Sequence, residues 1–212
     1  MTRTIVIADY GVGNLLSLER AIKAIGGQPH RTADPEIIAR AGHLILPGVG
    51  AFAHCVEQLQ NHGIKQAVLQ HSKSGNPMLG ICVGMQMMLS RSSEFGTHAG
   101  LDIIPGHVTG IAEITQDNGI KIPHIGWSRI SYHTADTGIA PLFLDFDKEA
   151  FVYFVHSFAA CPDDARHRLA ITSYEGHPIT AAINSGNIYG VQFHPEKSGP
   201  AGLGLLNSFK DL

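Results

Sequence analysis

The sequence predicts an α/β protein with a mostly parallel central sheet, helices on both faces and an added antiparallel portion. Short apolar runs typical of buried strands alternate with segments of helical spacing up to residue 90. Beyond residue 100 the segments are short, β-branched and separated by turns, which is typical of antiparallel connections. The 212 residues and 44% hydrophobic content fit a single domain over residues 1–212 with one core.

The composition argues against several classes of protein. The formal net charge is −3 with both signs interspersed, so nothing predicts a nucleic-acid surface. Cys55, Cys82 and Cys161 lie far apart, which suits free thiols in a reducing compartment rather than a disulfide framework. The apolar run at residues 4–8 is too short for a signal peptide, and no run is long enough to span a membrane. We therefore expect a cytoplasmic protein.

The first predicted unit is a strand over residues 4–8, a glycine-rich turn and a helix that ends at Gly26. The helix is indicated by apolar residues at helical spacing: Leu15, Leu18, Ala21, Ile22 and Ile25. Gly11 and Gly13 after a strand invite a dinucleotide-binding interpretation, but Leu16 stands where that fingerprint needs its third glycine. We therefore favour an ordinary strand–helix turn over a nucleotide site.

A second strand is predicted at residues 43–46, and it runs into the loop Pro47-Gly48-Val49-Gly50. Glycines two positions apart leave backbone N–H groups uncovered, which an anion-binding or oxyanion loop requires. The alternative is an ordinary connection to a helix over residues 53–61. The oxyanion interpretation gains weight from the next strand, because carboxyl ends of neighbouring parallel strands meet at one edge of a sheet.

The next strand ends in the pattern of a nucleophile elbow. Residues 77–81 form a short apolar run that leads into Gly80-Ile81-Cys82-Val83-Gly84, and helical spacing follows at Met85, Met88 and Leu89. A sharp strand-to-helix turn leaves no room for side chains, which explains Gly80 and Gly84. Cys82 would lie in the turn, where the start of a helix favours its thiolate. The alternative is a buried structural cysteine.

The second half of the chain is predicted to consist of strands and one closing helix. The expected strands are 106–115, 119–125, 128–133, 151–158, 168–174, 178–183 and 187–193. The helix is indicated by Leu203, Leu205, Leu206 and Phe209. The single tryptophan, Trp127, is either a core side chain or an aromatic group at the rim of a partner surface.

A cysteine nucleophile needs a general base, and the base needs a group that orients it. Of the thirteen histidines, His194 stands out because it follows the predicted strand 187–193 and precedes Glu196 by two positions. Residues at i and i+2 project to the same face of an extended segment, and the turn must then fold Glu196 toward the imidazole. The sequence thus predicts a Cys82, His194 and Glu196 triad, with a structural histidine as the alternative.

A metal site is not expected. His194-Pro195-Glu196 fits the beginning of the zinc deaminase signature, but that signature continues with two cysteines, and none follows Glu196. No His-Glu-x-x-His motif occurs elsewhere in the chain. We therefore expect neither a metal nor a cofactor.

Taken together, these motifs resemble the class I (triad) glutamine amidotransferases, through Gly80–Gln86 and Gly190–Glu196. Further motifs look like those of the glutaminase subunits of imidazole glycerol phosphate synthase: Tyr10–Asn14, Pro47–Gly50, Pro123–Trp127 and Phe154–Ser157. The resemblance covers essentially the whole chain in order. It implies a three-layer α/β fold and hydrolysis of L-glutamine to glutamate and ammonia. It also implies a heterodimer with a (β/α)8-barrel cyclase subunit, which forms imidazole glycerol phosphate and an aminoimidazole carboxamide ribotide in histidine biosynthesis.

The resemblance also implies roles for individual residues. Backbone N–H groups of Val83 and of the loop at Val49 and Gly50 would hold the oxyanion. Glutamine would be bound by Gln86, Glu94, Ser157 and Phe158. The subunit interface would include Pro123, Ile125, Trp127, Tyr153 and Lys197.

Two positions depart from the family pattern, which usually has Asn where this chain has Ser128 and often Tyr where it has Phe158. Neither departure touches the triad, but Ser128 bears on the partner and its control. Close paralogues supply ammonia to enzymes that amidate surface sugars, and this role stays open. Two other classes also remain: a stand-alone cysteine hydrolase or peptidase, in which histidine rather than Val83 often follows the cysteine, and a non-catalytic binding subunit.

Overall fold

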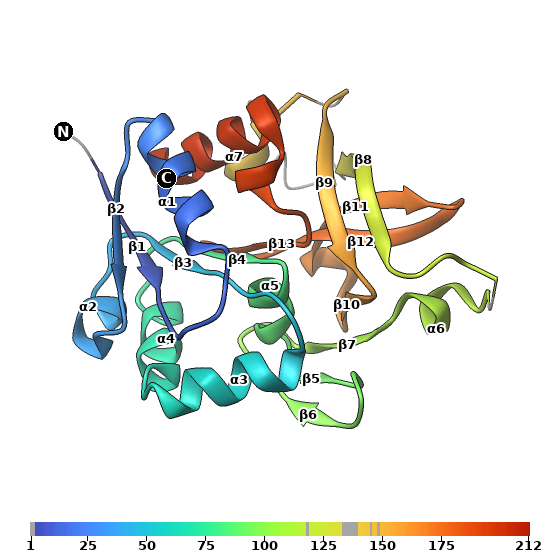
Figure 1. The fold of residues 1–212 in the computed structure, drawn as a ribbon, viewed down its shortest axis with the longest axis horizontal. Helices are drawn as coiled ribbons and strands as arrows, with labels where there is room; N and C mark the ends of the chain where they lie inside the picture. The colour runs from blue at the N-terminus through green and yellow to red at the C-terminus, as the bar shows by residue number, and fades with distance from the viewer. Residues whose placement is uncertain (1–2, 118, 133–139, 145, 148) are drawn as a thin grey trace.

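The computed structural model describes residues 3–117, 119–132, 140–144, 146–147 and 149–212. Its main sheet begins with five strands that pair in parallel, in the order β2-β1-β3-β4-β13. Their bounds are β1 Thr4–Ala8, β2 Gln28–Thr32, β3 Leu44–Leu46, β4 Met78–Ile81 and β13 Ile188–Val191. The parallel core that the sequence predicts is therefore present (Figure 1).

The same sheet continues with antiparallel strands in the order β13-β12-β11-β8-β9, so that the described residues form a nine-stranded sheet. The added strands are β12 His177–Ser185, β11 Arg168–Tyr174, β8 His124–Tyr132 and β9 Phe151–His156. A second sheet has the order β10-β7-β5-β6, with β10 Phe158–Pro162, β7 Gly106–Gly110, β5 Arg91–Ser92 and β6 His98–Ala99.

Helices cover both faces of the parallel part, which gives the three layers (Figure 1). Helices α1 Leu15–Ala24 and α7 Gly199–Asp211 pack together on one face. The other face carries α2 Pro35–Ala39, α3 Phe52–Asn61, α4 Lys65–Ser72 and α5 Val83–Met87. Strands β1, β3 and β4 are almost fully buried between these layers, as their apolar sequences predict.

The sequence prediction was wrong or incomplete in several places. Helix α4 and the short strands β5 and β6 were not expected. Strand β2 and helix α2 were not expected, because β2 is a polar, mostly exposed strand at the sheet edge and shows no apolar run. Residues 111–115 form helix α6 Ile111–Thr115 rather than a strand. The strand expected at 119–125 begins only at His124, and residue 133 of the expected segment 128–133 lies outside the described residues.

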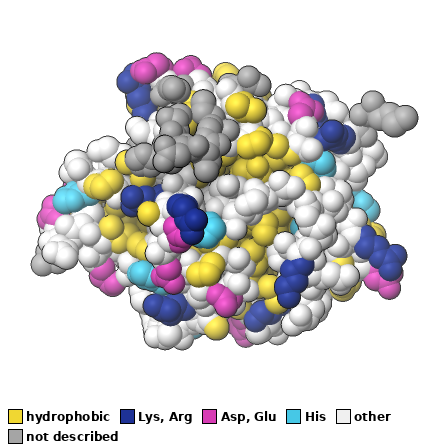
Figure 2. Space-filling model, turned by 180° about the vertical axis from the view of Figure 1, so that it is seen from behind, with side chains coloured by type: hydrophobic (Ala, Val, Ile, Leu, Met, Phe, Trp, Pro, Cys, Tyr) yellow, Lys and Arg dark blue, Asp and Glu magenta, His cyan; other side chains and the backbone are white. Residues whose placement is uncertain are grey.

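On the face opposite the view of Figure 1, the described residues carry charged side chains of both signs. Figure 2 shows Lys and Arg side chains interspersed with Asp and Glu over that face. This distribution agrees with the small net charge of −3. Among the described residues, no helix combines the length and apolar character that crossing a membrane requires.

Candidate active site

Cys82 lies in a strained turn between β4 and α5. Its backbone has φ 54° and ψ −114°, a conformation that a residue with a side chain rarely adopts. The backbone N–H of Cys82 donates a 2.8 Å hydrogen bond to the carbonyl of Val191, which ties the turn to β13. The helix after the turn ends at Met87, earlier than the spacing of Met88 and Leu89 suggests. The expected strand–elbow–helix arrangement is thus present, with a short helix.

Glycines make this turn possible because backbone atoms approach them closely. A Cβ atom on Gly84 would lie 1.9 Å from the carbonyl oxygen of Leu46, at the end of β3. A Cβ atom on Gly80 would lie 2.8 Å from Cα of Met85, where α5 packs onto β4. The same helix covers Gly190 on β13, where a Cβ would lie 2.4 Å from Cγ of Met85. The spacing of these glycines therefore reflects close packing of the elbow on three strands.

The strand order brings the other expected groups to either side of Cys82. Strands β3 and β13 both pair in parallel with β4, so the segments that follow all three strands meet at the same edge. The loop Pro47–Gly50 follows β3 on one side. His194 follows β13 on the other side. This edge of the sheet is where ligands bind in parallel α/β folds.

His194 interacts with both other members of the expected triad. Its Nδ1 lies 2.9 Å from Oε1 of Glu196, and both side chains are 3% exposed. A 3-10 turn over Pro195–Lys197 folds the carboxylate back onto the ring. The imidazole also interacts electrostatically with the side chain of Cys82. The structure thus brings together the three residues that the sequence singled out.

The electrostatics of this group favour a charged imidazole. Burial alone lowers the pKa of His194, but its interactions with Cys82 and Glu196 outweigh burial. They raise the pKa from 6.5 to about 9. His194 therefore carries a proton at neutral pH that it can transfer to a departing group.

We expect the free energy of unfolding to decrease as the pH rises from 6.5 to about 9. A histidine whose pKa is raised by folding stabilises the protein fully below its unfolded pKa, and this stabilisation is lost as pH passes the folded value. The loss should be about 1–3 kcal/mol. Urea unfolding of the wild type and of His194→Gln across this range measures it. An equal pH dependence in both proteins would contradict the assigned ion pairing.

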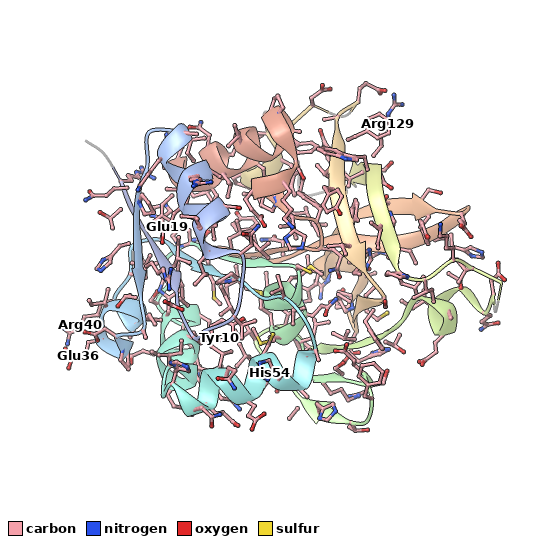
Figure 3. The ribbon with its side chains drawn as sticks, in the orientation of Figure 1. Tyr10, Glu19, Glu36, Arg40, His54 and Arg129 are labelled. Atoms are coloured by element: carbon pink, nitrogen blue, oxygen red, sulfur yellow. The ribbon has the colours of Figure 1, made fainter. Side chains whose placement is uncertain are left out.

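Two buried side chains donate hydrogen bonds to backbone carbonyls of the loop Pro47–Gly50. The hydroxyl of Tyr10 donates to the carbonyl of Pro47, and the thiol of Cys55 donates to the carbonyl of Val49 over 3.3 Å. Burial raises the pKa of Cys55 to about 11, so this thiol remains a donor. Because C=O and N–H point in opposite directions in a trans peptide, the N–H of Gly50 faces away from Cys55. Figure 3 shows Tyr10 in the interior of the molecule.

A cavity of about 700 Å³ opens over the triad. It is lined by Cys82 and His194 and by every residue that was expected to hold the oxyanion or bind glutamine: Val49, Gly50, Val83, Gln86, Glu94, Ser157 and Phe158. Some of these groups already have partners. Glu94 accepts a 2.6 Å hydrogen bond from the N–H of Phe52, and the Ser157 carbonyl accepts one of 2.9 Å from the N–H of Ile111.

Sequence reasoning missed several residues in and around this cavity. Gln192 is fully buried and its Nε2 lies 3.7 Å from the Cys82 sulfur. It precedes His194 by two positions, so the same periodicity that singled out Glu196 could have found it. His156 lines the cavity and is buried, but one histidine among thirteen in an apolar strand gave no signal. Tyr10 and Cys55 hydrogen-bond carbonyls of the loop Pro47–Gly50, a contact that could not be predicted without the fold.

The residues expected at a subunit interface lie close to one another near the cavity. Trp127 is 53% exposed, so it is a surface aromatic rather than a core side chain. Its ring contacts Tyr153 edge-on with centroids 5.8 Å apart, and the Lys197 amine lies 5.9 Å from the Tyr153 ring. Ile125 is exposed on the same strand, and Pro123 lines the cavity together with Lys197. We refer to Pro123, Ile125, Trp127, Tyr153 and Lys197 as the aromatic rim.

Comparison with known proteins agrees with this geometry. Residues 6–210 match the family described as glutamine amidotransferase class-I.

The chain belongs to the class-I glutamine amidotransferase family.

Curated relatives cover the whole chain. It is 43% identical to the imidazole glycerol phosphate synthase subunit HisH of Syntrophotalea carbinolica, over 98% of this chain and 100% of the relative. It is 45% identical to subunit HisH 1 of Legionella pneumophila strain Paris, over 99% of each chain. The family and the closer resemblance that the sequence predicted are therefore confirmed.

Solved structures of this class have the same fold. PurLQS from Thermotoga maritima has a TM-score of 0.72 at 16% identity, over 100% of this chain and 99% of the other. A GMP synthase protein from Thermoplasma acidophilum has a TM-score of 0.69 at 18% identity, over 100% of this chain and 94% of the other. These comparisons confirm the predicted fold class.

Proposed function

We propose that this chain is the glutaminase subunit of an imidazole glycerol phosphate synthase and releases ammonia from L-glutamine through Cys82, His194 and Glu196. The observation that carries the proposal is the contact of Cys82, on its strained elbow, with a buried His194–Glu196 pair at a cavity. An imidazole beside a cysteine favours the thiolate, which is the nucleophilic form. The identity to HisH subunits supports this choice of substrate and pathway.

In the first half of the reaction the Cys82 thiolate attacks the side-chain amide carbon of glutamine. The carbonyl oxygen becomes an oxyanion, which N–H groups of Val83 and of the loop at Val49 and Gly50 stabilise. His194 donates its proton to the amide nitrogen as the C–N bond breaks. Ammonia leaves, and the glutamyl group stays on Cys82 as a thioester.

In the second half a water molecule hydrolyses this thioester. His194 is now neutral and accepts a proton from water as the water oxygen attacks the thioester carbon. Glu196 holds Nδ1 of the ring, so that Nε2 faces the reacting atoms. Collapse of the second oxyanion releases glutamate and regenerates the Cys82 thiolate beside the protonated His194.

The opposite end of glutamine is bound by groups on the cavity wall. Glu94 supplies a carboxylate and Gln86 an amide oxygen for the α-ammonium group. The carbonyls of Ser157 and Phe158 already accept hydrogen bonds from the protein. Their backbone N–H groups are therefore the better candidates for contacts with the α-carboxylate.

The partner is proposed to be a (β/α)8-barrel cyclase subunit that docks on the aromatic rim and forms a heterodimer. Replacing Trp127 by Ala should weaken binding of this subunit by about 1–3 kcal/mol, since exposed aromatic side chains often dominate interfaces. Isothermal titration calorimetry measures the loss. Arg40→Ala is a matched control, because Arg40 is exposed directly after α2, at the opposite end of the molecule from Arg129 on β8 (Figure 3). Equal losses in both variants would contradict this docking surface.

The decisive test of the function is ammonia release from glutamine, measured for the chain alone, with the cyclase subunit, and with that subunit and its ribonucleotide ligand. If the loop at Val49 must reorient to complete the oxyanion hole, the chain alone should be nearly inactive, since one missing oxyanion donor costs about a hundredfold or more in rate. A large increase with partner and ligand is expected. High turnover without the partner would contradict the gating. No response in a folded complex would favour a sugar-amidating partner.

A further inference from the structure

A buried chain of hydrogen bonds leads away from the nucleophile. Gln192 Nε2 donates to the Cys82 sulfur over 3.7 Å, and Gln192 Oε1 lies 2.9 Å from Gln86 Nε2. Gln86 Nε2 is also 2.9 Å from the carbonyl oxygen of Phe158. The mechanism described above uses Cys82, Gln86 and Phe158 but gives no role to Gln192.

The chain of hydrogen bonds continues through two histidines to β8, which carries Ile125 and Trp127 of the aromatic rim. His156 Nδ1 lies 2.9 Å from the Phe158 carbonyl oxygen, and His156 Nε2 lies 3.0 Å from Nδ1 of His124. His124 Nε2 lies 3.0 Å from the hydroxyl oxygen of Ser128. The chain therefore runs from Ser128 on β8 to Cys82 through six consecutive hydrogen bonds.

The two histidines are neutral, which fixes the direction of each bond. Burial lowers the pKa of His124 to about 4, and burial is also the main reason that the pKa of His156 falls to about 3. A carbonyl oxygen only accepts, so His156 must donate from Nδ1 and, being neutral, accept at Nε2. His124 must then donate from Nδ1 and accept at Nε2. The hydroxyl of Ser128 is consequently the donor at the far end.

The same argument fixes both carboxamides. The Phe158 oxygen accepts two bonds, from His156 and from Gln86, so Gln86 must face it with its NH2 group. The second N–H of Gln86 then meets an oxygen of Gln192, which leaves the NH2 group of Gln192 facing the sulfur. A donor at that position stabilises a thiolate, whereas a flipped amide would present an oxygen and destabilise it.

Packing holds the histidine rings in place. The ring of His124 stacks between Tyr174 and Phe154, with centroid distances of 4.0 and 4.8 Å. The exposed fraction is 1% for His124 and 6% for His156. Neither ring can rotate without displacing its neighbours. The direction of each hydrogen bond therefore depends only on which ring nitrogen carries the proton.

We propose that Ser128, His124 and His156 are positioning residues for Cys82. Together they fix how the Gln86 and Gln192 carboxamides are oriented, so that Gln192 presents its NH2 group to the thiolate. The proposal rests on Cys82 being the nucleophile. It gives Ser128 a defined role as the donor at the start of the hydrogen-bond chain. The related glutaminase subunits usually have Asn at this position. The proposal also leaves Gln86 Oε1 as an acceptor for a donor in the cavity.

Removing the Ser128 hydroxyl should affect the carboxamides next to Cys82, although Ser128 does not contact them. Without that donor, Nε2 of His124 is a buried acceptor that lacks a hydrogen bond, which narrows the free-energy gap to the tautomer protonated on Nε2. In that tautomer Nδ1 of His124 becomes an acceptor that faces another acceptor on His156. Relief of that conflict moves the proton of His156 to Nε2, which leaves a bare Nδ1 facing the Phe158 carbonyl. The carbonyl then loses one of its two donors, and the carboxamides lose their fixed orientation.

Nitrogen NMR of the histidine rings tests the direction of hydrogen-bond donation in the wild-type protein. Both His124 and His156 should be neutral with the proton on Nδ1 at neutral pH, and His124→Phe, which keeps an aromatic ring in the stack, identifies the His124 signals. An Nε2-protonated or charged ring at either position would overturn the proposal without touching the triad assignment.

An isosteric pair of variants tests the effect on the nucleophile. Ser128→Thr keeps a hydroxyl donor and Ser128→Val replaces it with a methyl group of similar shape. The rate of Cys82 alkylation by iodoacetamide, followed by peptide mass spectrometry at neutral pH, should stay close to wild type for Thr and fall about fivefold for Val, the worth of one hydrogen bond. Partner affinity should be the same for the two variants.

The outcomes separate this proposal from the function itself. Equal alkylation rates for Thr and Val would overturn the positioning role while the nucleophile assignment stands. Failure of wild-type Cys82 to react faster than Cys161, which is half-buried, would instead contradict the nucleophile assignment.

Discussion

Cys82→Ala should lower ammonia release from glutamine by about 10⁴-fold or more, even with the cyclase subunit present. Without the sulfur no thioester can form, and neither His194 nor the oxyanion donors can replace the nucleophile. Steady-state ammonia production by the complex measures the loss. The strain of the elbow should remain in this variant, because the conformation that Cys82 adopts is strained for any residue with a side chain.

Cys161→Ala is the matched control for this experiment. Cys161 is a free cysteine on β10, half-buried and outside the cavity that contains the triad. We expect that variant to keep wild-type activity. Substantial activity in Cys82→Ala would show that the elbow does not carry the nucleophile, whatever the behaviour of Cys161→Ala.

Gly84→Ala should remove both folding stability and activity. The added methyl group would lie 1.9 Å from the carbonyl oxygen of Leu46, and both groups belong to the backbone of packed elements. The overlap can be relieved only by moving α5 away from β3, which we expect to cost about 3 kcal/mol or more. Because Leu46 leads directly into the loop at Pro47, the shift should also disturb the oxyanion donors. Urea unfolding and ammonia release measure the two effects.

Gly204→Ala provides the control for an added methyl group. Gly204 lies within α7, and a Cβ there would meet no atom within 4 Å. Alanine favours helix over glycine by about 1 kcal/mol, so this variant should be slightly more stable and equally active. A Gly84→Ala protein as stable as the wild type would contradict the close packing of the elbow.

The parts of the fold that sequence predicted best are those with strong local signals. The strands that end at Ala8, Leu46 and Ile81 are continuous apolar runs, and the elbow glycines surround a single cysteine. Pairing of those strands in parallel then brings their carboxyl ends together by geometry alone. The polar edge strand β2 lacks such a run, because only one of its sides packs against another strand.

The candidate site was predictable to the extent that its residues are close in sequence. His194 and Glu196 are two positions apart, so their contact could be inferred from a turn. Gln192 needed only the same argument and was missed. His124 and His156 are separated by 32 positions and meet because β8 and β9 pair in one register. No local pattern encodes that register, so their contact required the structure.

The central claim is that Cys82 is the nucleophile that attacks glutamine. The most direct test is labelling of the protein, in complex with the cyclase subunit, by a glutamine analogue that carries an electrophilic carbon in place of the side-chain amide, followed by peptide mass spectrometry. The account predicts one adduct per chain on Cys82, none on Cys55 or Cys161, and protection by glutamine. An unlabelled Cys82, or labelling at Cys55 that glutamine prevents, would contradict it.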